Sequence, residues 1–149
     1  MRKQTHLLVK IRPLVLFVLI TGFVCIFKIV FVAGQSMEPT LRNHQIMLVY
    51  KLADVYEEDD IIVFNTKQNG VCVKRVIAEK DDFIQLKEGK VFRNKVELSG
   101  YSCRENVEME YILNEDEYFV IGDNIEASID SRDFGCIKKQ DIIGKVIAY

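Results

Sequence analysis

A long apolar segment follows a short basic arm at the start of the chain. Residues 14–33 read LVLFVLITGFVCIFKIVFVA, and only Thr21, Gly22 and Lys28 interrupt the apolar side chains. About 20 such residues, each rising about 1.5 Å in a helix, span a bilayer core of roughly 30 Å. A cleaved secretory signal has a shorter apolar core, of about 7–15 residues. The pattern therefore predicts a retained transmembrane helix over 14–33.

Beyond residue 41 the apolar residues come in short runs that are typical of β-strands. Polar turns separate the expected strands, which cover 46–50, 61–64, 71–77, 83–86, 91–93, 118–121 and 142–149. The turns 65–70 and 87–90 predict two hairpins. No segment after residue 33 keeps a helical period for long. We therefore expect a mainly β fold, in which the transmembrane helix precedes a compact antiparallel, β-barrel-like domain.

Charge divides the chain at the apolar segment. Arginine and lysine occur in the arm without any acid, and all 22 acidic residues of the chain lie after residue 33. Positive residues beside a membrane helix stay on the cytoplasmic side. We expect a cytoplasmic basic arm at 1–13, a single membrane pass at 14–33 and an extracytoplasmic domain at 34–149. An acidic outer domain argues against nucleic acid as a partner, because phosphate binding needs a basic patch.

The cysteines and histidines do not form a pattern that is typical of a metal site. Beyond the apolar segment lie Cys72, Cys103 and Cys136, an odd number without a CxxC pair. Free thiols are favoured over a bridge, although the sequence leaves the pairing open. His6 and His44 belong to no cluster of ligands. We expect no metal and no cofactor.

Lys74 is the first residue with candidate chemistry, because it interrupts the apolar strand expected at 71–77. Side chains alternate between the two faces of a strand, so Lys74 and its neighbour Arg75 point to opposite sides. One of the two cations must then face a largely apolar side. Burial lowers the pKa of a lysine, which can then act as a general base near neutral pH. The alternative is a lysine whose stem packs while its amine reaches solvent.

Ser36 is the second candidate, just beyond the apolar segment and between Gly34 and Pro39. A serine becomes a nucleophile only beside a base. Gly34 allows close backbone approach, which suits a site where backbone N–H groups face an oxyanion. The alternative is a serine that caps a turn.

The segment 122–135, GDNIEASIDSRDFG, is the third candidate. Ser128, Asp130 and Arg132 recur at every second position, so they could share one side of an extended segment and fix a neighbouring group by hydrogen bonds. The alternative is a solvated loop that is rich in turn formers.

These three segments, in this order, resemble bacterial type I signal peptidases, which are membrane-anchored Ser–Lys proteases. The matching stretches are SMEPTL at 36–41, DIIVF at 60–64, KRVI at 74–77 and the segment 122–135. The resemblance implies a fold of the signal-peptidase type, in the small single-anchor form seen in Gram-positive bacteria. It departs from the family at Cys72, Ile125 and 78–82, which leaves the pocket shape open.

The resemblance also implies roles for individual residues. Ser36 corresponds to the nucleophile, with its backbone N–H as one oxyanion donor, and Lys74 corresponds to the general base. Gly34 has no hydroxyl to supply the second donor, which stays open. Ser128 corresponds to the serine that orients the lysine. Two salt bridges are expected to support the site: Arg75 with Asp123, and Asp130 with Arg132. Three residues are expected to bind substrate in small apolar pockets: Val32, Met37 and Val73.

The sequence therefore predicts a membrane-bound serine endopeptidase that cleaves N-terminal signal peptides from exported preproteins after small residues. The expected partners are preprotein signal peptides, membrane lipid and the secretion machinery. One alternative is a specialised processing peptidase of a single secretion, pilus or conjugation system. A second alternative is a non-catalytic, membrane-tethered adaptor.

Overall fold

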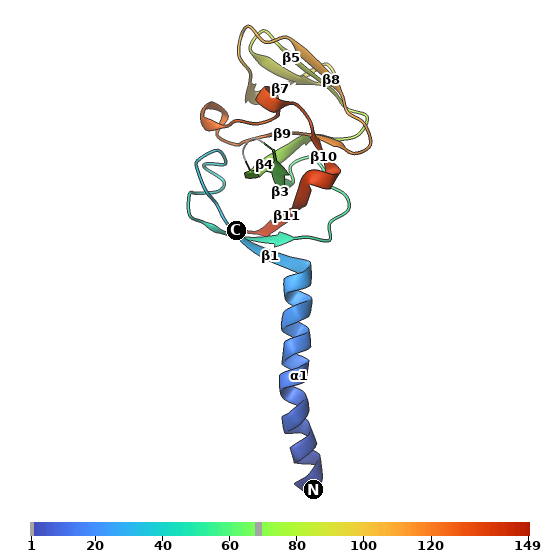
Figure 1. The fold of residues 1–149 in the computed structure, drawn as a ribbon. Helices are drawn as coiled ribbons and strands as arrows, with labels where there is room; N and C mark the ends of the chain where they lie inside the picture. The colour runs from blue at the N-terminus through green and yellow to red at the C-terminus, as the bar shows by residue number, and fades with distance from the viewer. Residues whose placement is uncertain (1, 68–69) are drawn as a thin grey trace.

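A computed structural model describes residues 2–67 and 70–149, with the backbone alone for residues 2–11. The helix α1 (Arg2–Ile26) projects from a body of β-strands (Figure 1). The strands, in chain order, are β1 (Phe27–Phe31), β2 (Ile46–Tyr50), β3 (Ile61–Thr66), β4 (Gly70–Ala78), β5 (Phe83–Lys87), β6 (Lys90–Arg93), β7 (Val96–Ser102), β8 (Met109–Ile112), β9 (Glu117–Ile121), β10 (Ile137–Lys138) and β11 (Ile142–Ala148). Three short helices complete the fold: η1 (Ile125–Ala127), α2 (Ser131–Phe134) and η2 (Lys139–Asp141).

The predicted helix over 14–33 is wrong at its end, because α1 stops at Ile26 and the next residues form β1. β1 pairs antiparallel with β2, from Phe27 opposite Tyr50 to Phe31 opposite Ile46. The sequence FKIVF favours this outcome, since aromatic and β-branched side chains suit a strand. Among the described residues, no helix has the length and apolar character needed to cross a membrane.

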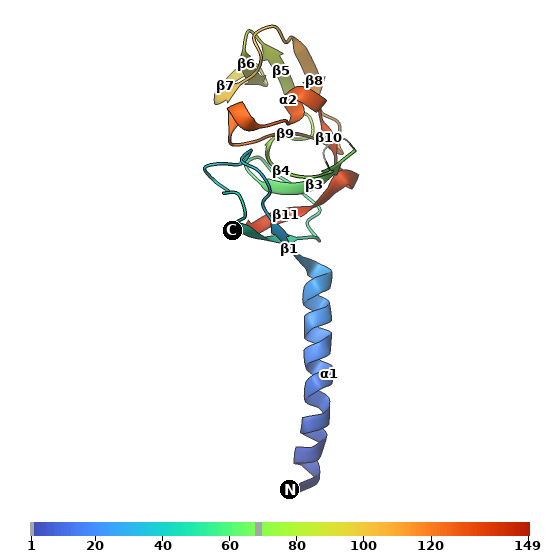
Figure 2. The ribbon, with the colours of Figure 1, turned by 60° about the vertical axis from the view of Figure 1, so that its left-hand side comes forward.

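The strands form two antiparallel sheets, which confirms a mainly β fold. One sheet has the order β1-β2-β11-β3-β4-β9-β10, and the other has the order β7-β6-β5-β8. The expected barrel-like closure is wrong, since β1 and β10 do not pair in the described part of the chain. β10 is only two residues long and pairs with β9 alone, so it offers little edge on which to close a barrel. Both views place the smaller sheet at the end of the body far from α1 (Figure 2).

Most expected strands are confirmed, and both hairpins are present as β3–β4 and β5–β6. The sequence missed β7 and β8, which flank a stretch without clear alternation. They pair with β6 and β5 and complete the smaller sheet. Tertiary pairing, rather than local pattern, defines these two strands.

Within the described residues the hydrophobic core has three clusters, and one of them anchors the segment that carries Ser36. Met37 and Leu41 are fully buried in this cluster, together with Val49 of β2 and Val63 of β3. Each such side chain contributes about 1.5–3 kcal/mol by leaving water. Two buried residues so close to Ser36 fix the backbone that presents its hydroxyl.

Candidate active site

The segment between β1 and β2 holds Ser36 through backbone hydrogen bonds on both sides. Val32 donates its N–H to Gln45 at 2.9 Å, and its carbonyl accepts from His44 at 2.9 Å. Gly34, whose φ is +102°, donates its N–H to the side-chain oxygen of Asn43 at 3.0 Å. This left-handed backbone favours glycine, which explains the residue at this position. Hydrogen bonds therefore fix the loop that carries Ser36, and the serine does not act simply as the cap of a turn.

Lys74 lies in β4, opposite Ile62 of β3, with only 4% of its surface exposed. Its Nζ donates to Ser36 Oγ at 2.6 Å. Burial lowers the pKa of Lys74 below its ordinary value, and this effect outweighs the opposing effect of nearby acidic groups. A neutral amine at this distance can accept the serine proton instead of donating one. The pair can therefore act as base and nucleophile.

Arg75 faces away from Lys74, as strand alternation predicts, and forms the expected ion pair with Asp123. Its Nε and Nη2 contact the two carboxylate oxygens at 2.8 and 2.6 Å, and its Nη1 donates to the carbonyl of Asp59 at 2.9 Å. The bidentate geometry is the strong form of an arginine–carboxylate contact. It ties β4 to the segment that follows β9.

Asp130 is the centre of a buried polar network, with no exposed surface. Its carboxylate accepts from Ser128 Oγ at 2.6 Å, from the Gly122 N–H at 3.0 Å and from Arg132 Nε at 2.8 Å. It also caps α2, in a reciprocal capping box with Asp133. The expected Asp130–Arg132 ion pair is therefore present, and its acid fixes the fold of the whole segment.

The sequence expected Ser128, Asp130 and Arg132 to share one side of an extended segment, and this is wrong for Arg132. Ser128 directly follows η1, Asp130 precedes α2, and Arg132 lies inside α2. The cap turns the chain so that all three still meet. A side chain on Gly122 would clash with Ser128 Oγ and with the Ser36 carbonyl, so Gly122 allows the two serines to approach.

Ser128 does not contact Lys74 in the way the resemblance implies. Its hydroxyl donates to Asp130, and the described residues contain no hydrogen bond between Ser128 and the lysine amine. Its orienting role stays a prediction. The hydroxyl oxygen retains lone pairs that could accept a proton from the amine.

Asn124 contributes to the site, and the sequence analysis did not single it out. Its backbone N–H donates to the Ser36 carbonyl at 3.0 Å, and its side-chain Nδ2 donates to the Gln35 carbonyl at 3.1 Å. The signal that could have found it is its place directly after Asp123, in the same polar segment. Asn124 thus fixes the backbone on which the Ser36 hydroxyl depends.

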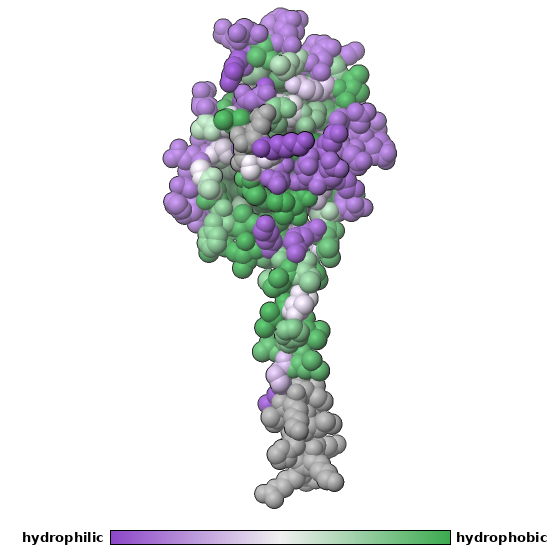
Figure 3. Space-filling model, in the orientation of Figure 1, coloured by the Kyte–Doolittle hydropathy of each residue, from purple (hydrophilic) through white to green (hydrophobic). Residues whose placement is uncertain are grey.

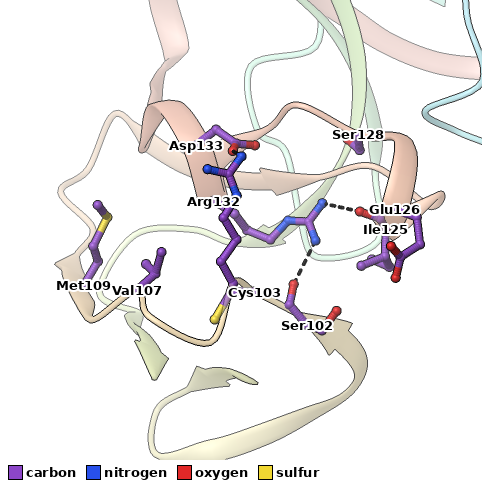
Figure 4. A pocket seen from close by; sticks show the side chains of 10 residues that line it. Ser102, Cys103, Val107, Met109, Ile125, Glu126, Ser128, Arg132 and Asp133 are labelled. Carbon is purple, nitrogen blue, oxygen red and sulfur yellow. Dashed lines mark hydrogen bonds and ion pairs between the residues drawn. The ribbon is translucent and has the colours of Figure 1, made fainter. Parts of the chain in front are cut away.

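Arg132 also braces the wall of a separate cavity of about 380 Å³, which Ser36 and Lys74 do not line. Figure 4 shows its guanidinium between two carbonyl oxygens, with Nη1 donating to Ser102 at 2.8 Å and Nη2 donating to Ile125 at 3.0 Å. These bonds join β7 and η1 to α2. Arg132 therefore links the smaller sheet to the segment that supports the active site.

A groove of about 560 Å³ contains Ser36 and Lys74. It lies between two strand edges that have no strand partner in the described residues. β1 pairs only with β2, and β4 pairs with β9 only from Arg75 onward. The three expected substrate-binding residues all line the groove: Val32, Met37 and Val73. The first two are buried and Val73 is half-buried, so they form an apolar wall beside the hydroxyl.

The cysteines, all four of which lie in the described residues, are free thiols. Burial raises the pKa of Cys136 to about 12 and also raises that of Cys103. Neither thiol is therefore activated as a nucleophile, because the thiolate is the reactive form. The sequence left open whether any of the cysteines form a disulfide, and the structure shows free thiols.

A serine hydroxyl against a buried lysine amine, beside an open strand edge, is the arrangement of a serine hydrolase that uses lysine instead of histidine. Comparison with known proteins specifies the family. Residues 4–149 match the family model described as "Signal peptidase, peptidase S26". The chain belongs to this family of serine peptidases.

Individual relatives agree with this assignment. The chain is 32% identical to a signal peptidase I of Bacillus licheniformis, over 90% of this chain and 81% of the relative. It is 29% identical to signal peptidase I P of Bacillus subtilis subsp. natto, over 96% and 88% of the two chains. A crystal structure of a signal peptidase I from Enterococcus faecalis V583 matches with a TM-score of 0.50 and 27% identity, covering 63% of this chain and 98% of that one.

Proposed function

We propose that this chain is a membrane-attached endopeptidase that removes N-terminal signal peptides from preproteins, with Ser36 as nucleophile and Lys74 as general base. The observation that carries the proposal is the 2.6 Å contact between Ser36 Oγ and the amine of a buried lysine. Membership of the signal peptidase family supports the substrate class.

The reaction begins when the neutral Lys74 amine takes the proton of the Ser36 hydroxyl. The oxygen attacks the carbonyl of the scissile peptide bond and forms a tetrahedral oxyanion. Among the described residues nothing accepts the Ser36 backbone N–H, so it is free to donate to that oxyanion. The protonated lysine then gives its proton to the leaving amine. Water, deprotonated by Lys74, hydrolyses the acyl–Ser36 ester and regenerates both groups.

The substrate binds as an added strand in the groove between β1 and β4. Both edges present unpaired backbone groups, which an extended peptide can satisfy by β-augmentation. Val32, Met37 and Val73 leave shallow apolar space near the hydroxyl. Small side chains, such as alanine, fit there without the steric cost that larger ones meet.

Attachment to the membrane is supported by the distribution of apolar surface. On the face shown in Figure 3, hydrophobic residues dominate the coloured part of α1 and lie beside a few hydrophilic ones on the adjoining end of the body, while hydrophilic residues dominate the far end. The exposed apolar residues of that end include Ile29 and Phe31 of β1, Ile46 of β2 and Ile147 of β11. Basic residues of the arm at 1–13 favour a cytoplasmic N-terminus, with residues from about 34 onward outside.

Cleavage of a preprotein by the full chain in detergent tests this proposal. We expect mass spectrometry to find a cut after a small residue at the end of the signal peptide. Ser36→Ala and Lys74→Met should each abolish cutting while the melting temperature stays close to that of wild type. Methionine keeps the length of the lysine stem and removes the buried amine, so its effect on folding is small. Full activity in either folded variant would contradict the proposed pair.

A further inference from the structure

The groove that holds Ser36 carries one charged side chain besides Lys74, and this is Lys28 of β1. Alternate residues of a strand share a face, so Lys28 points to the same side of β1 as Val30 and Val32. Val32 is buried in the core cluster beside Met37, and Val30 packs against it. Residues from both faces of β1 line the groove, and Lys28 lies at the end of β1 far from Ser36.

Nothing in the groove compensates the charge of Lys28. The other lining residues are apolar or uncharged, apart from Lys74, and none of them is acidic. Within the described residues Lys28 takes part in no ion pair. The Lys28 side chain is exposed, so solvent screens its ammonium group and a carboxylate beside it gains only a modest attraction.

The position of Lys28 along β1 fixes which part of a bound peptide it meets. Strands advance about 3.3 Å per residue, so Lys28 lies about 13 Å from Val32 along the strand. A peptide added beside β1 advances at a similar rate. If the small residue before the cut lies against Val32 and the peptide runs parallel to β1, the peptide residue near Lys28 is about four positions farther from the cut on the N-terminal side.

We propose that Lys28 is a specificity-determining residue, which selects substrates with an acidic side chain in the segment shortly before the cut. This inference rests on the proposed function, because it concerns the same groove. A carboxylate there meets an unpaired ammonium, whereas a lysine of the substrate meets a like charge. The preferred substrate class is thus a preprotein whose cleavage region carries Asp or Glu about four residues before the small residue that contacts Val32.

Competition between matched peptides tests this selection in the full chain in detergent. The peptides share one cleavage site and differ by Asp, Asn or Lys at successive positions before the cut. For wild type we expect kcat/KM to be about two- to five-fold higher with Asp than with Asn at one position, and lower with Lys. This ratio should fall to about one in Lys28→Gln and invert in Lys28→Glu. Added salt should reduce it.

Lys87→Gln is the matched control, because Lys87 lies on β5 in the smaller sheet and does not line the groove. It should keep the wild-type Asp/Asn ratio. An unchanged ratio in Lys28→Gln would overturn the inference. The inference would also be overturned if Lys28→Gln lost activity equally on all peptides, and did so only when the assay used vesicles of anionic lipid. Lys28 would then bind a lipid phosphate and not the substrate.

The same assay separates this inference from the proposed function. If wild type cleaves the peptides and Ser36→Ala does not, the peptidase assignment holds whatever the charge ratio shows. If wild type cleaves none of them, or Ser36→Ala cleaves as wild type does, the proposed function fails first. If wild type cleaves the peptides but shows no preference for Asp over Asn, the role of Lys28 is overturned and the proposed function stands.

Discussion

At the residue scale, the environment of Lys74 explains how a lysine can act as a base. Its amine is buried and contacts Ser36 Oγ, while the neighbouring cation Arg75 is paired with Asp123. The two adjacent basic residues therefore differ in charge state. Arg75 is charged and paired with Asp123, whereas burial favours the neutral form of Lys74. Burial lowers the pKa of Lys74, since the charged form loses more hydration than the neutral form.

Asn124 should act as a positioning residue through its bonds to the backbone at Gln35 and Ser36. Asn124→Ala removes only the side-chain bond, which contributes about 0.5–1.5 kcal/mol. We expect kcat to fall by about two- to ten-fold with little change in KM, because the hydroxyl loses alignment rather than substrate contacts.

Steady-state kinetics of Asn124→Ala and Asn114→Ala check this expectation. The Asn114 side chain donates to Glu117 and does not line the groove, so its variant should keep the wild-type kcat. Equal effects of the two substitutions, or a change confined to KM, would show that Asn124 does not position the nucleophile.

The sequence carried most of the residue-scale information. The motifs had singled out Ser36, Lys74, Arg75 and Asp123, and the structure shows two separate contacts among them, Lys74 with Ser36 and Arg75 with Asp123. The contacts of Asn124 could not be predicted, because they depend on how the segment after β9 approaches the segment after β1. That approach is set by tertiary packing.

At the scale of elements, Asp130 holds the segment between β9 and β10 in place. It is wholly buried and bonded to Ser128, Gly122 and Arg132 at once. Asp130→Ala should lower the free energy of unfolding by about 3–5 kcal/mol, because it leaves the Arg132 guanidinium without its charge partner. Chemical denaturation measures this loss.

Glu115→Ala provides the control for Asp130→Ala. Glu115 pairs with Lys80 on the surface, and both side chains are largely exposed. Its removal should change stability by no more than about 0.5 kcal/mol. A loss at Asp130 as small as the loss at Glu115 would contradict the structural role of the buried network.

The elements that local pattern could not predict are those that tertiary contacts define. Apolar content alone cannot distinguish a helix end from a strand in residues 27–31, and pairing with β2 decides it. The α2 helix is four residues long and depends on the Asp130 cap rather than on a periodic pattern. The hairpins, by contrast, were predictable because their polar turn residues lie between short apolar runs.

At the scale of the whole molecule, we expect the boundary between α1 and β1 to separate the segment that attaches the chain to the membrane from the body that carries the proposed active site. A chain that begins at Phe27 keeps β1, its pairing with β2 and the groove. We expect it to fold, to cleave peptides and to lose binding to lipid vesicles. A chain that begins at Gly34 also loses buried Val32, and its stability should fall by at least about 2 kcal/mol.

Denaturation curves and vesicle sedimentation of the two truncated chains check this boundary. Equal stability of both chains would show that β1 is not part of the folded body. If the chain that begins at Phe27 bound vesicles as well as the full chain does, α1 would not provide the attachment. The exposed apolar end of the body would then be the part that binds lipid.

The pH dependence of kcat/KM for wild type tests the central claim most directly, namely that a buried lysine activates Ser36. The neutral amine is the active form, and it is lost as pH falls through the lowered pKa of Lys74. Activity should therefore rise with pH, and the midpoint of this rise should lie below the ordinary lysine value of 10.5. A rate that rises only near that ordinary value would contradict the account.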